Sequence, residues 1–255
     1  MDFIPKITAV SYLNTIPFVY GLKHADNLRA ELSLAPPADC ARNYIEGRAD
    51  VALLPAAVVP SLTDANIITD YCIGAVGAVR TVTVMSHHPI SAVKRIWLDP
   101  HSRTSVQLCG YLAKHKWHIT PEWIAMSDYA RVESPEEGDA FLLIGDKVFG
   151  YEGRFPYIYD LAIEWREATK LPFAFAVWVA RKGLSYDVHD ALERALTYGV
   201  EHTYEAILES EYAEREYAYE YLTCNIDFLF DSQKHKALKK FWDFGLKVEP
   251  KVNPG

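Results

Sequence analysis

Three short segments of the chain are rich in small polar residues, and each follows an apolar run. They are Ser11-Tyr12-Leu13-Asn14, Ser102-Arg103-Thr104-Ser105 and Gly145-Asp146. Hydroxyl and amide side chains beside the free N–H groups of a helix start form an anion-binding geometry. Several hydrogen bonds of roughly 1.5–3 kcal/mol each to a charged group hold a small carboxylate without an excess of lysine. The segments therefore predict a site for a small anion.

Each segment also has a simpler interpretation. Ser102 or Thr104 is typical of a helix cap, although capping needs one hydroxyl and this segment has three. Gly145-Asp146 alone is typical of an ordinary turn. The three segments share one position, after the carboxyl end of a predicted strand, where ligands bind in open α/β sheets. This coincidence favours a common ligand site.

Other chemical signatures are missing from the sequence. It contains no Cys-x-x-Cys, His-Glu-x-x-His, Walker loop or Gly-x-Ser-x-Gly elbow. The adjacent His87 and His88 would point to opposite faces of a strand, and a solvated turn is the better interpretation. His115 and His118 have no carboxylate nearby to complete a ligand set. We expect no metal and no cofactor.

Short apolar runs alternate with helical patterns, which is typical of an α/β sheet covered by helices. The predicted strands are 7–10, 51–54, 82–85, 95–98, 140–144 and 173–179. The predicted helices start near Pro17, end near Gly47, and span 105–116, 190–208 and 236–246. The C-terminal quarter is expected to be helical throughout.

Composition narrows the classes of function. The 255 residues are 50% hydrophobic, and 26 basic against 34 acidic side chains give a net charge of −8. An acidic chain does not favour broad binding to nucleic acid or to an anionic membrane. The four cysteines are widely spaced and no signal-peptide core opens the sequence, so we expect reduced thiols and a cytoplasmic protein.

The length predicts one large domain or two lobes. No Gly/Ser linker separates two halves, so strands would have to cross between lobes, and 82–86 and 176–181 are the candidates. The expected first lobe comprises 1–82 and 180–255, and the second comprises 83–179.

Six ordered segments resemble the chorismate dehydratases of menaquinone biosynthesis by the futalosine pathway. They are Ser11-Tyr12-Leu13-Asn14 with Pro17, the segment 47–55, Gly77-Ala78-Val79-Arg80, the segment 98–106, Leu143-Ile144-Gly145-Asp146, and the segment 159–178. Ala78 stands where this family tends to have proline, and Ala56 stands where it often has serine. The second difference removes a hydroxyl contact.

The resemblance implies an α/β, two-lobed, type II periplasmic-binding-protein-like fold with the ligand in the cleft between the lobes. It also implies that water is removed from chorismate to give 3-[(1-carboxyvinyl)oxy]benzoate. Aromatisation drives this reaction, and donors aimed at the ring carboxylate would stabilise a carbanion intermediate.

Asn14 is the expected catalytic residue, and it would orient the departing hydroxyl or the enolpyruvyl carboxylate. The expected substrate-binding residues are Ser11, Ser86, Thr104, Ser105, Ile144, Gly145 and Asp146. With no histidine or lysine in the three segments as defined, the substrate's own enolpyruvyl carboxylate is the hypothetical proton acceptor. Asp146 is the alternative base. Arg80 and Arg103 would reach the ligand or pair with carboxylates, and pairing is favoured for Arg80.

Two other functions stay open. The sister enzyme of the pathway, which acts on cyclic dehypoxanthine futalosine, is similar in fold, but its usual Ser-Pro-Cys-Pro-Asn-Asp opening differs from the segment Ser11-Tyr12-Leu13-Asn14. A non-catalytic protein of the same fold would bind a small anion and release it unchanged.

Overall fold

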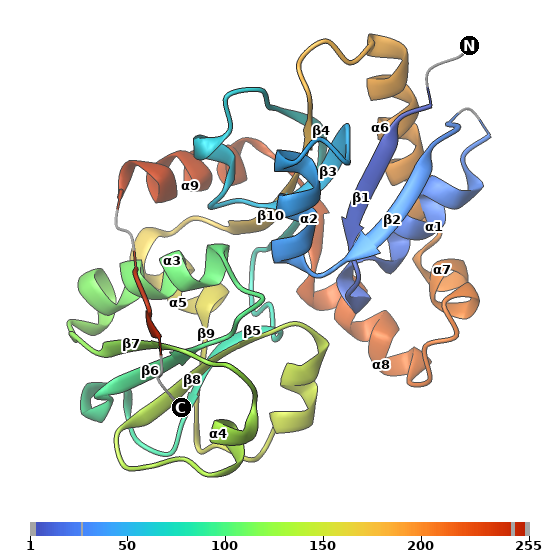
Figure 1. The fold of residues 1–255 in the computed structure, drawn as a ribbon. Coiled ribbons are helices and arrows are strands. Elements are labelled where there is room, and N and C mark those ends of the chain that lie inside the picture. Colours follow the sequence, from blue (N-terminus) through green and yellow to red (C-terminus); the bar gives the residue numbers. More distant parts are fainter. Residues whose placement is uncertain (1–3, 27, 246–247, 253–255) are drawn as a thin grey trace. The chain divides into compact units, whose positions relative to one another are not determined.

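The computed structural model describes residues 4–26, 28–245 and 248–252 (Figure 1). The chain forms two compact units. Unit 1 comprises Met1–Ala75 and Ala174–His235, and unit 2 comprises Val76–Phe173 and Lys236–Gly255. Each unit contains a six-stranded sheet in which strands run both parallel and antiparallel.

The sheet of unit 1 has the strand order β11-β4-β10-β3-β1-β2. Its strands are β1 (Lys6–Val10), β2 (Glu31–Ala35), β3 (Val51–Pro55), β4 (Asn66–Ala75), β10 (Phe173–Ala180) and β11 (Asp227–Leu229). β1 runs parallel to β2 and β3, so the carboxyl ends of these three strands lie at one edge of the sheet. β3 is buried along its whole length, as expected for a central strand with both faces covered.

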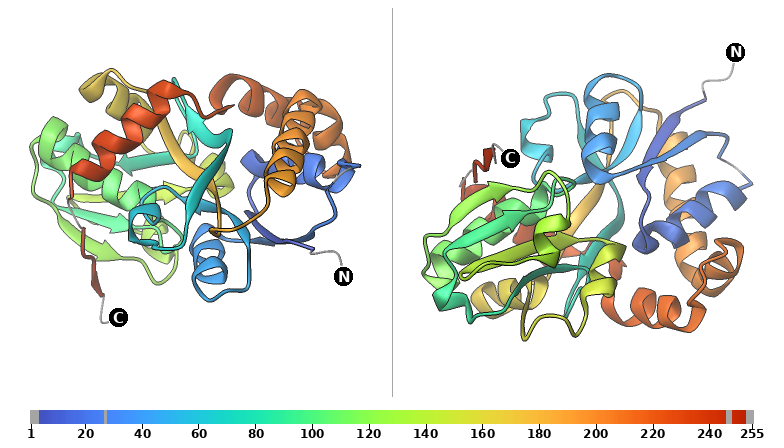
Figure 2. Two further views of the ribbon diagram at one scale, coloured as in Figure 1. Left: turned by 90° about the horizontal axis from the view of Figure 1, so that it is seen from above. Right: turned by 60° about the horizontal axis from the view of Figure 1, so that its bottom comes forward.

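Helices cover both faces of this sheet. The helices that lie wholly within unit 1 are α1 (Ile16–His24), α2 (Pro37–Ile45), α6 (Tyr186–Glu201), α7 (Thr203–Glu209) and α8 (Arg215–Glu220), with short 3₁₀ turns η1 (Leu13–Thr15) and η2 (Val59–Ser61) and the π-helical η6 (Tyr221–Asn225). α2 lies on one face, and α1 and α6 lie on the other (Figures 1 and 2). Phe18 of α1 packs edge-on against Tyr71, Trp178 and Phe228, with ring centroids 6.1, 5.7 and 5.1 Å away. This contact holds α1 against the sheet.

Two glycines allow α1 and α6 to touch backbone to backbone. A Cβ atom at Gly21 would lie 1.9 Å from the carbonyl oxygen of Ala195, and one at Gly199 would lie 1.9 Å from that of Pro17. No side chain fits at either position. α6 therefore supports the first turn of α1, three residues after Asn14.

The sheet of unit 2 has the strand order β12-β7-β6-β8-β5-β9. Its strands are β5 (Val82–Ser86), β6 (Arg95–Leu98), β7 (Glu122–Ala125), β8 (Asp139–Ile144), β9 (Tyr157–Asp160) and β12 (Lys251–Val252). Its helical elements are η3 (Ile90–Ala92), α3 (Thr104–Leu112), the π-helical η4 (Ala113–Trp117), α4 (Ala130–Glu133), η5 (Asp146–Tyr151), α5 (Leu161–Thr169) and the last part of α9 (Ser232–Asp243).

An apolar core lies between this sheet and the α4 and η5 segments. Its buried members include Met85, Phe141 and Leu143 from the strands, Val132 from α4 and Val148 from η5. α3 and α5 contact each other and the strands β8, β5 and β9, and they lie together in Figure 1.

All six predicted apolar runs form strands, namely β1, β3, β5, β6, β8 and β10. The remaining strands were not predicted, because most of them lie at sheet edges and lack a continuous apolar run. β2, for example, is exposed or half-buried at every position. An edge strand whose side chains are exposed or half-buried has few apolar residues, so its sequence shows little apolar pattern.

The predicted helix 190–208 is wrong as a single element. His202, with φ −110° and ψ 38°, separates α6 from α7, and the Thr203 hydroxyl donates to the Val200 carbonyl at 2.8 Å. The helical C-terminal quarter is also wrong, because β11 and β12 lie within it. The predicted helix 236–246 corresponds to the end of α9, and Leu246 lies outside the described residues.

The two units differ from the expected lobe boundaries. β5 lies wholly within the sheet of unit 2, so 82–86 is not a crossing strand. Residues 236–255 belong to unit 2 instead of the first lobe. The physical reason is aromatic packing, since Phe241 of α9 contacts Phe173 and Trp165 with centroids 5.3 and 6.4 Å away.

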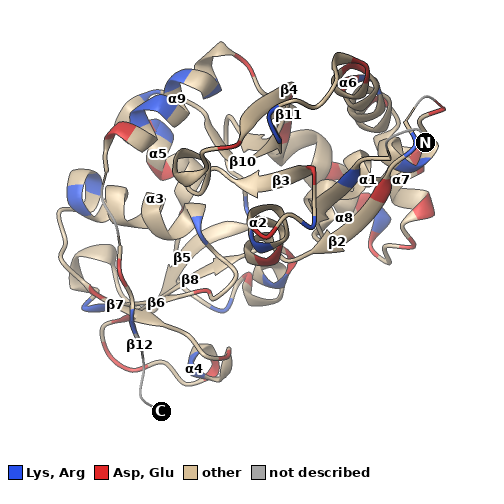
Figure 3. Ribbon diagram, turned by 45° about the horizontal axis from the view of Figure 1, so that its top comes forward, with Lys and Arg blue, Asp and Glu red and all other residues tan. Residues whose placement is uncertain are grey.

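The four cysteines are free thiols, of which Cys40, Cys72 and Cys109 are buried and Cys224 is exposed. Charged residues of both signs are spread over the elements of each unit (Figure 3). Within the described ranges, no helix has the length and apolar character needed to cross a bilayer.

We expect Gly199→Ala to destabilise unit 1. The added methyl would clash with the Pro17 carbonyl, and overpacking of this kind costs about 1–3 kcal/mol or more. Gly77→Ala is the matched control, because a Cβ atom there meets nothing within 4 Å. Urea unfolding followed by tryptophan fluorescence measures the difference, and equal midpoints for the two variants would contradict the backbone contact.

Candidate functional site

The segment after β1 leaves the unit 1 sheet at its carboxyl edge. Val10 is paired with Ala35 at the end of β2, and the Ser11 N–H donates to the Ala35 carbonyl at 3.1 Å. The Thr15 hydroxyl donates to the carbonyls of Val10 and Tyr12, which folds the segment into a tight turn before α1. Ser11 is exposed, whereas Asn14 is buried.

Asn14 carries an unusual feature. Its residue is 9% exposed, and its Oδ1 atom is buried and has no hydrogen-bond partner among the described residues. A buried acceptor left without a donor costs about 1–3 kcal/mol. A ligand that donates a hydrogen bond to this oxygen would remove that cost.

The segment after β6 shows the same feature in unit 2. Ser102 is 3% exposed, and its Oγ atom has no partner in the described part of the chain. Thr104 and Ser105 are also buried, in the first turn of α3. The N-cap position is Arg103, whose side chain makes no capping hydrogen bond. The helix-cap interpretation of Ser102 therefore does not account for its buried hydroxyl.

The segment after β8 begins with Gly145, whose backbone conformation requires glycine. Gly145 has φ 75° and ψ −169°, a region that is essentially restricted to glycine. Its N–H donates to the Thr81 carbonyl at 2.9 Å, and its own carbonyl accepts from the Val148 N–H at 3.0 Å. These bonds direct the chain from the sheet into η5, with half-buried Asp146 as the first residue of that turn.

The segments after β6 and β8 lie at one edge of the unit 2 sheet. β6 and β8 are parallel, with Leu98 opposite Leu142. Asp99 joins their ends, because its buried carboxylate accepts from the Ile144 N–H at 3.2 Å and from the Lys147 Nζ at 2.8 Å. The start of α3, with Thr104 and Ser105, and the segment Ile144-Gly145-Asp146 therefore both follow the carboxyl ends of neighbouring parallel strands in unit 2.

Sequence reasoning missed Asp99 and Lys147 as parts of this arrangement. Asp99 directly precedes Pro100, a dipeptide typical of a turn, and Lys147 directly follows the predicted Gly145-Asp146 segment. The available signal was their position, since Asp99 is one residue after the predicted strand 95–98 and Lys147 is three residues after the predicted strand 140–144.

Ser86 lies apart from the other predicted residues of unit 2. β5 runs antiparallel to β8, so Val82 is opposite Ile144 and Ser86 is opposite Ala140. Four residues of extended chain separate the two ends by roughly 13 Å. The Ser86 hydroxyl donates to the Asp139 carbonyl at 2.9 Å and accepts from the His88 N–H at 3.1 Å. The structure gives Ser86 a structural role at the opposite edge of the sheet.

An ion cluster surrounds Asp139 at that opposite edge. Its carboxylate accepts from Arg95 Nε at 2.6 Å, from Arg131 at 2.9 Å and from the Glu136 N–H at 2.9 Å. Burial alone would raise the pKa of Asp139, but the Glu136 hydrogen bond and the Arg95 charge hold this pKa below its usual value. Arg80 is likewise paired, with Glu152 at 3.0 Å, as the sequence favours.

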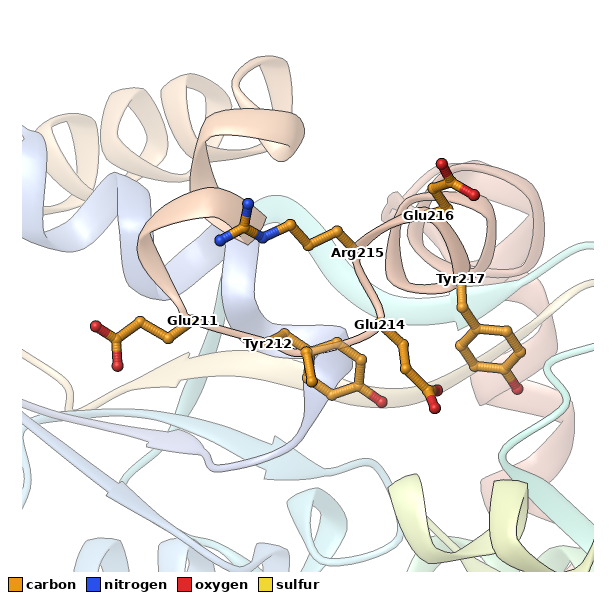
Figure 4. Close-up of a pocket in the computed structure, with 7 residues that line it drawn as sticks. Glu211, Tyr212, Glu214, Arg215, Glu216 and Tyr217 are labelled. Carbon is orange, nitrogen blue, oxygen red and sulfur yellow. The ribbon is translucent and has the colours of Figure 1, made fainter.

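An open pocket of about 810 Å³ lies along the loop between α7 and α8 (Figure 4). Its lining is the continuous segment from Glu211 to Tyr217, which contains three glutamates, one arginine and two tyrosines. It contains no residue of the predicted site. Among the described residues, no three histidine, cysteine or acidic side chains are grouped as metal ligands.

Comparison with solved structures defines the class of fold. A protein from Archaeoglobus fulgidus is 20% identical with a TM-score of 0.75, covering 94% of this chain and 96% of that one. A Candida albicans gene product described as having the generic periplasmic binding protein fold is 13% identical with a TM-score of 0.64, covering 97% and 92%. The Xanthomonas axonopodis alkanesulfonate-binding protein is 10% identical with a TM-score of 0.60, covering 95% and 93%. The fold is therefore periplasmic-binding-protein-like, as predicted.

The family follows from the sequence match. The model of the menaquinone biosynthesis family matches residues 5–247, and the chain belongs to this family. A relative from Thermus thermophilus named chorismate dehydratase is 27% identical over 198 residues, which cover 65% of this chain and 70% of that protein.

We expect Gly145→Ala to destabilise unit 2 by more than about 1 kcal/mol, because alanine is strained at this φ. The same strain would displace Asp146. Gly150→Ala in η5 is the control, since a Cβ atom there has open space. Thermal unfolding of both variants measures the effect, and an unchanged Gly145→Ala midpoint would contradict the assigned backbone conformation.

Stability should also depend on pH through Asp139. Because its pKa in the folded state is lowered, the carboxylate stabilises the fold above about pH 4 and loses this contribution as the pH falls. Asp139→Asn should be less stable than the unchanged protein at pH 7, and this difference should shrink toward pH 3. Urea unfolding across this range measures it, and a difference that grows in acid would contradict the lowered pKa.

Proposed function

We propose that the protein is a chorismate dehydratase, which converts chorismate to 3-[(1-carboxyvinyl)oxy]benzoate and water. The observation that carries this proposal is the buried, unpartnered Oδ1 of Asn14, in a segment that resembles the family's motif. An acceptor of this kind suits a substrate hydroxyl, and chorismate carries one at the carbon where elimination occurs. Membership of the menaquinone biosynthesis family and the Thermus relative support the same reaction.

The proposed elimination is stepwise. A ring C–H bond breaks first, its electron pair is delocalised toward the ring carboxylate, and the substrate's enolpyruvyl carboxylate accepts the proton. The bond between the ring carbon and the hydroxyl group then breaks. The departing hydroxide takes the proton from the enolpyruvyl carboxylic acid and leaves as water, and the ring becomes aromatic. Because the second carboxylate of the substrate serves as base, the protein has to hold a near-attack geometry and stabilise negative charge.

The donors of unit 2 suit that second task. Ser102, Thr104 and Ser105 are buried hydroxyl residues at the start of α3, where the helix dipole favours an anion. Preorganised donors in a dry site stabilise developing charge more than water does. We propose that they bind carboxylate oxygens of the substrate, that Ile144, Gly145 and Asp146 line the same region, and that Ser11 and Asn14 are further substrate-binding residues.

Incubation of the purified protein with chorismate tests the reaction directly. Loss of the diene absorbance with formation of the aryl ether would support a dehydratase. Binding of chorismate without loss of absorbance would instead support a non-catalytic binding protein, a function compatible with the fold neighbours. Turnover of cyclic dehypoxanthine futalosine alone would support the sister enzyme.

We expect Asn14→Ala to lower kcat roughly 100-fold, in the range seen when one catalytic hydrogen-bonding group is removed. The fold should persist, because no described residue depends on Asn14 Oδ1 for a hydrogen bond. Steady-state kinetics and thermal unfolding measure both effects. A kcat within twofold of the unchanged protein would contradict the role of Asn14.

Asp146→Asn separates the two candidate bases. If the substrate's carboxylate accepts the proton, the variant keeps most of the turnover, because a neutral amide of the same shape remains at the start of η5. If Asp146 is the base, turnover is abolished while chorismate still binds. Kinetics together with equilibrium binding distinguish these outcomes, and the second outcome would reverse the assignment.

A further inference from the structure

Asp99 and Lys147 form a close ion pair at the carboxyl edge of the unit 2 sheet. The Asp99 side chain is fully buried, the Lys147 side chain is 26% exposed, and Nζ lies 2.8 Å from Oδ2. Burial of a carboxylate is unfavourable unless charge and hydrogen bonds compensate it. At Asp99, both the opposite charge of Lys147 and several hydrogen bonds offset the cost of burying the carboxylate.

Four donors converge on the Asp99 carboxylate. Oδ1 accepts from the His101 N–H at 3.0 Å and from the Tyr129 hydroxyl at 3.1 Å. Oδ2 accepts from the Ile144 N–H at 3.2 Å and from Lys147. His101 directly precedes Ser102, and Ile144 directly precedes Gly145. One side chain thus fixes the starting points of both polar segments.

Lys147 completes this connection. Its ammonium group also donates to the Ile144 carbonyl at 2.9 Å and lies 4.8 Å from the centroid of the Tyr129 ring. Both backbone polar groups of Ile144 are therefore bonded to the pair, the N–H to Asp99 and the carbonyl to Lys147.

We propose that Asp99 and Lys147 are positioning residues, with Asp99 holding the two polar segments in register and Lys147 cancelling the charge that Asp99 brings to an anion site. This inference rests on the proposed function, since it assumes a substrate with two carboxylates. Without the lysine, the Asp99 carboxylate would repel that substrate, because like charges interact strongly where water is partly excluded. The Asp99–Lys147 ion pair has no net charge, so Asp99 can order the two polar segments without repelling the substrate.

The charge role is tested by Lys147→Met and by the double variant Asp99→Asn with Lys147→Met. The single variant leaves one uncompensated negative charge, so its KM for chorismate should rise about tenfold or more. Added salt should reduce this rise by screening. The double variant has no such uncompensated charge, so its KM should return close to that of the unchanged protein. Its kcat should fall, because asparagine cannot accept all four hydrogen bonds.

Lys116→Met is the matched control. Lys116 is also partly buried in unit 2, and it pairs with Glu164 at 2.6 Å, away from the segments after β6 and β8. It should lower stability without a change in KM. If Lys147→Met leaves KM unchanged, or if the double variant has as high a KM as the single one, the charge role is overturned.

The positioning role is tested without substrate. In Asp99→Ala, backbone amide hydrogen exchange should accelerate in the segments containing His101 and Ile144, relative to the rest of the unit 2 sheet. Unchanged exchange in both segments would overturn this role. Absence of chorismate turnover by the unchanged protein would overturn the proposed function and the charge role built on it, and the exchange result would still decide the positioning role.

Discussion

An acceptor buried without a donor is the constraint on which this account depends. The Asn14 side-chain oxygen follows β1 in a turn closed by Thr15, and α1 continues directly from that turn. The contact of Gly199 with Pro17 and the packing of Phe18 hold α1 in place. Asn14 is itself buried, and a ligand that donates a hydrogen bond would satisfy its Oδ1 atom.

Unit 2 contributes hydrogen-bond donors to the proposed site. Its segments after β6 and β8 contain hydroxyl groups and the start of α3, and the ion pair between Asp99 and Lys147 connects the two segments. In the proposed function, these hydroxyl and N–H donors would bind carboxylates through directional hydrogen bonds and not through an excess of positive charge. It agrees with an acidic chain whose net charge of −8 would repel an anion at long range.

The sequence predicted the central strands and the polar segments because both have strong local signals. β3 and β8 are buried at every position and read as continuous apolar runs, whereas β2 and β9 lie at edges and do not. Ser86, which lies opposite Ala140 and not near Ile144, shows the limit of such reasoning. Its position depends on the antiparallel register of β5 with β8, which is a long-range pairing that no local pattern encodes. The role of Asp99 was missed for a related reason, since three of its four donors, on Tyr129, Ile144 and Lys147, lie at least 30 residues away in the chain.

A crystal structure of the protein with 3-[(1-carboxyvinyl)oxy]benzoate or chorismate bound would test the central claim most directly. The account predicts that an oxygen of chorismate donates a hydrogen bond to Asn14 Oδ1, and that carboxylate oxygens of either ligand accept from the Ser102–Ser105 segment. A chorismate complex in which Asn14 Oδ1 and Ser102 Oγ have no hydrogen-bond partner would contradict this account.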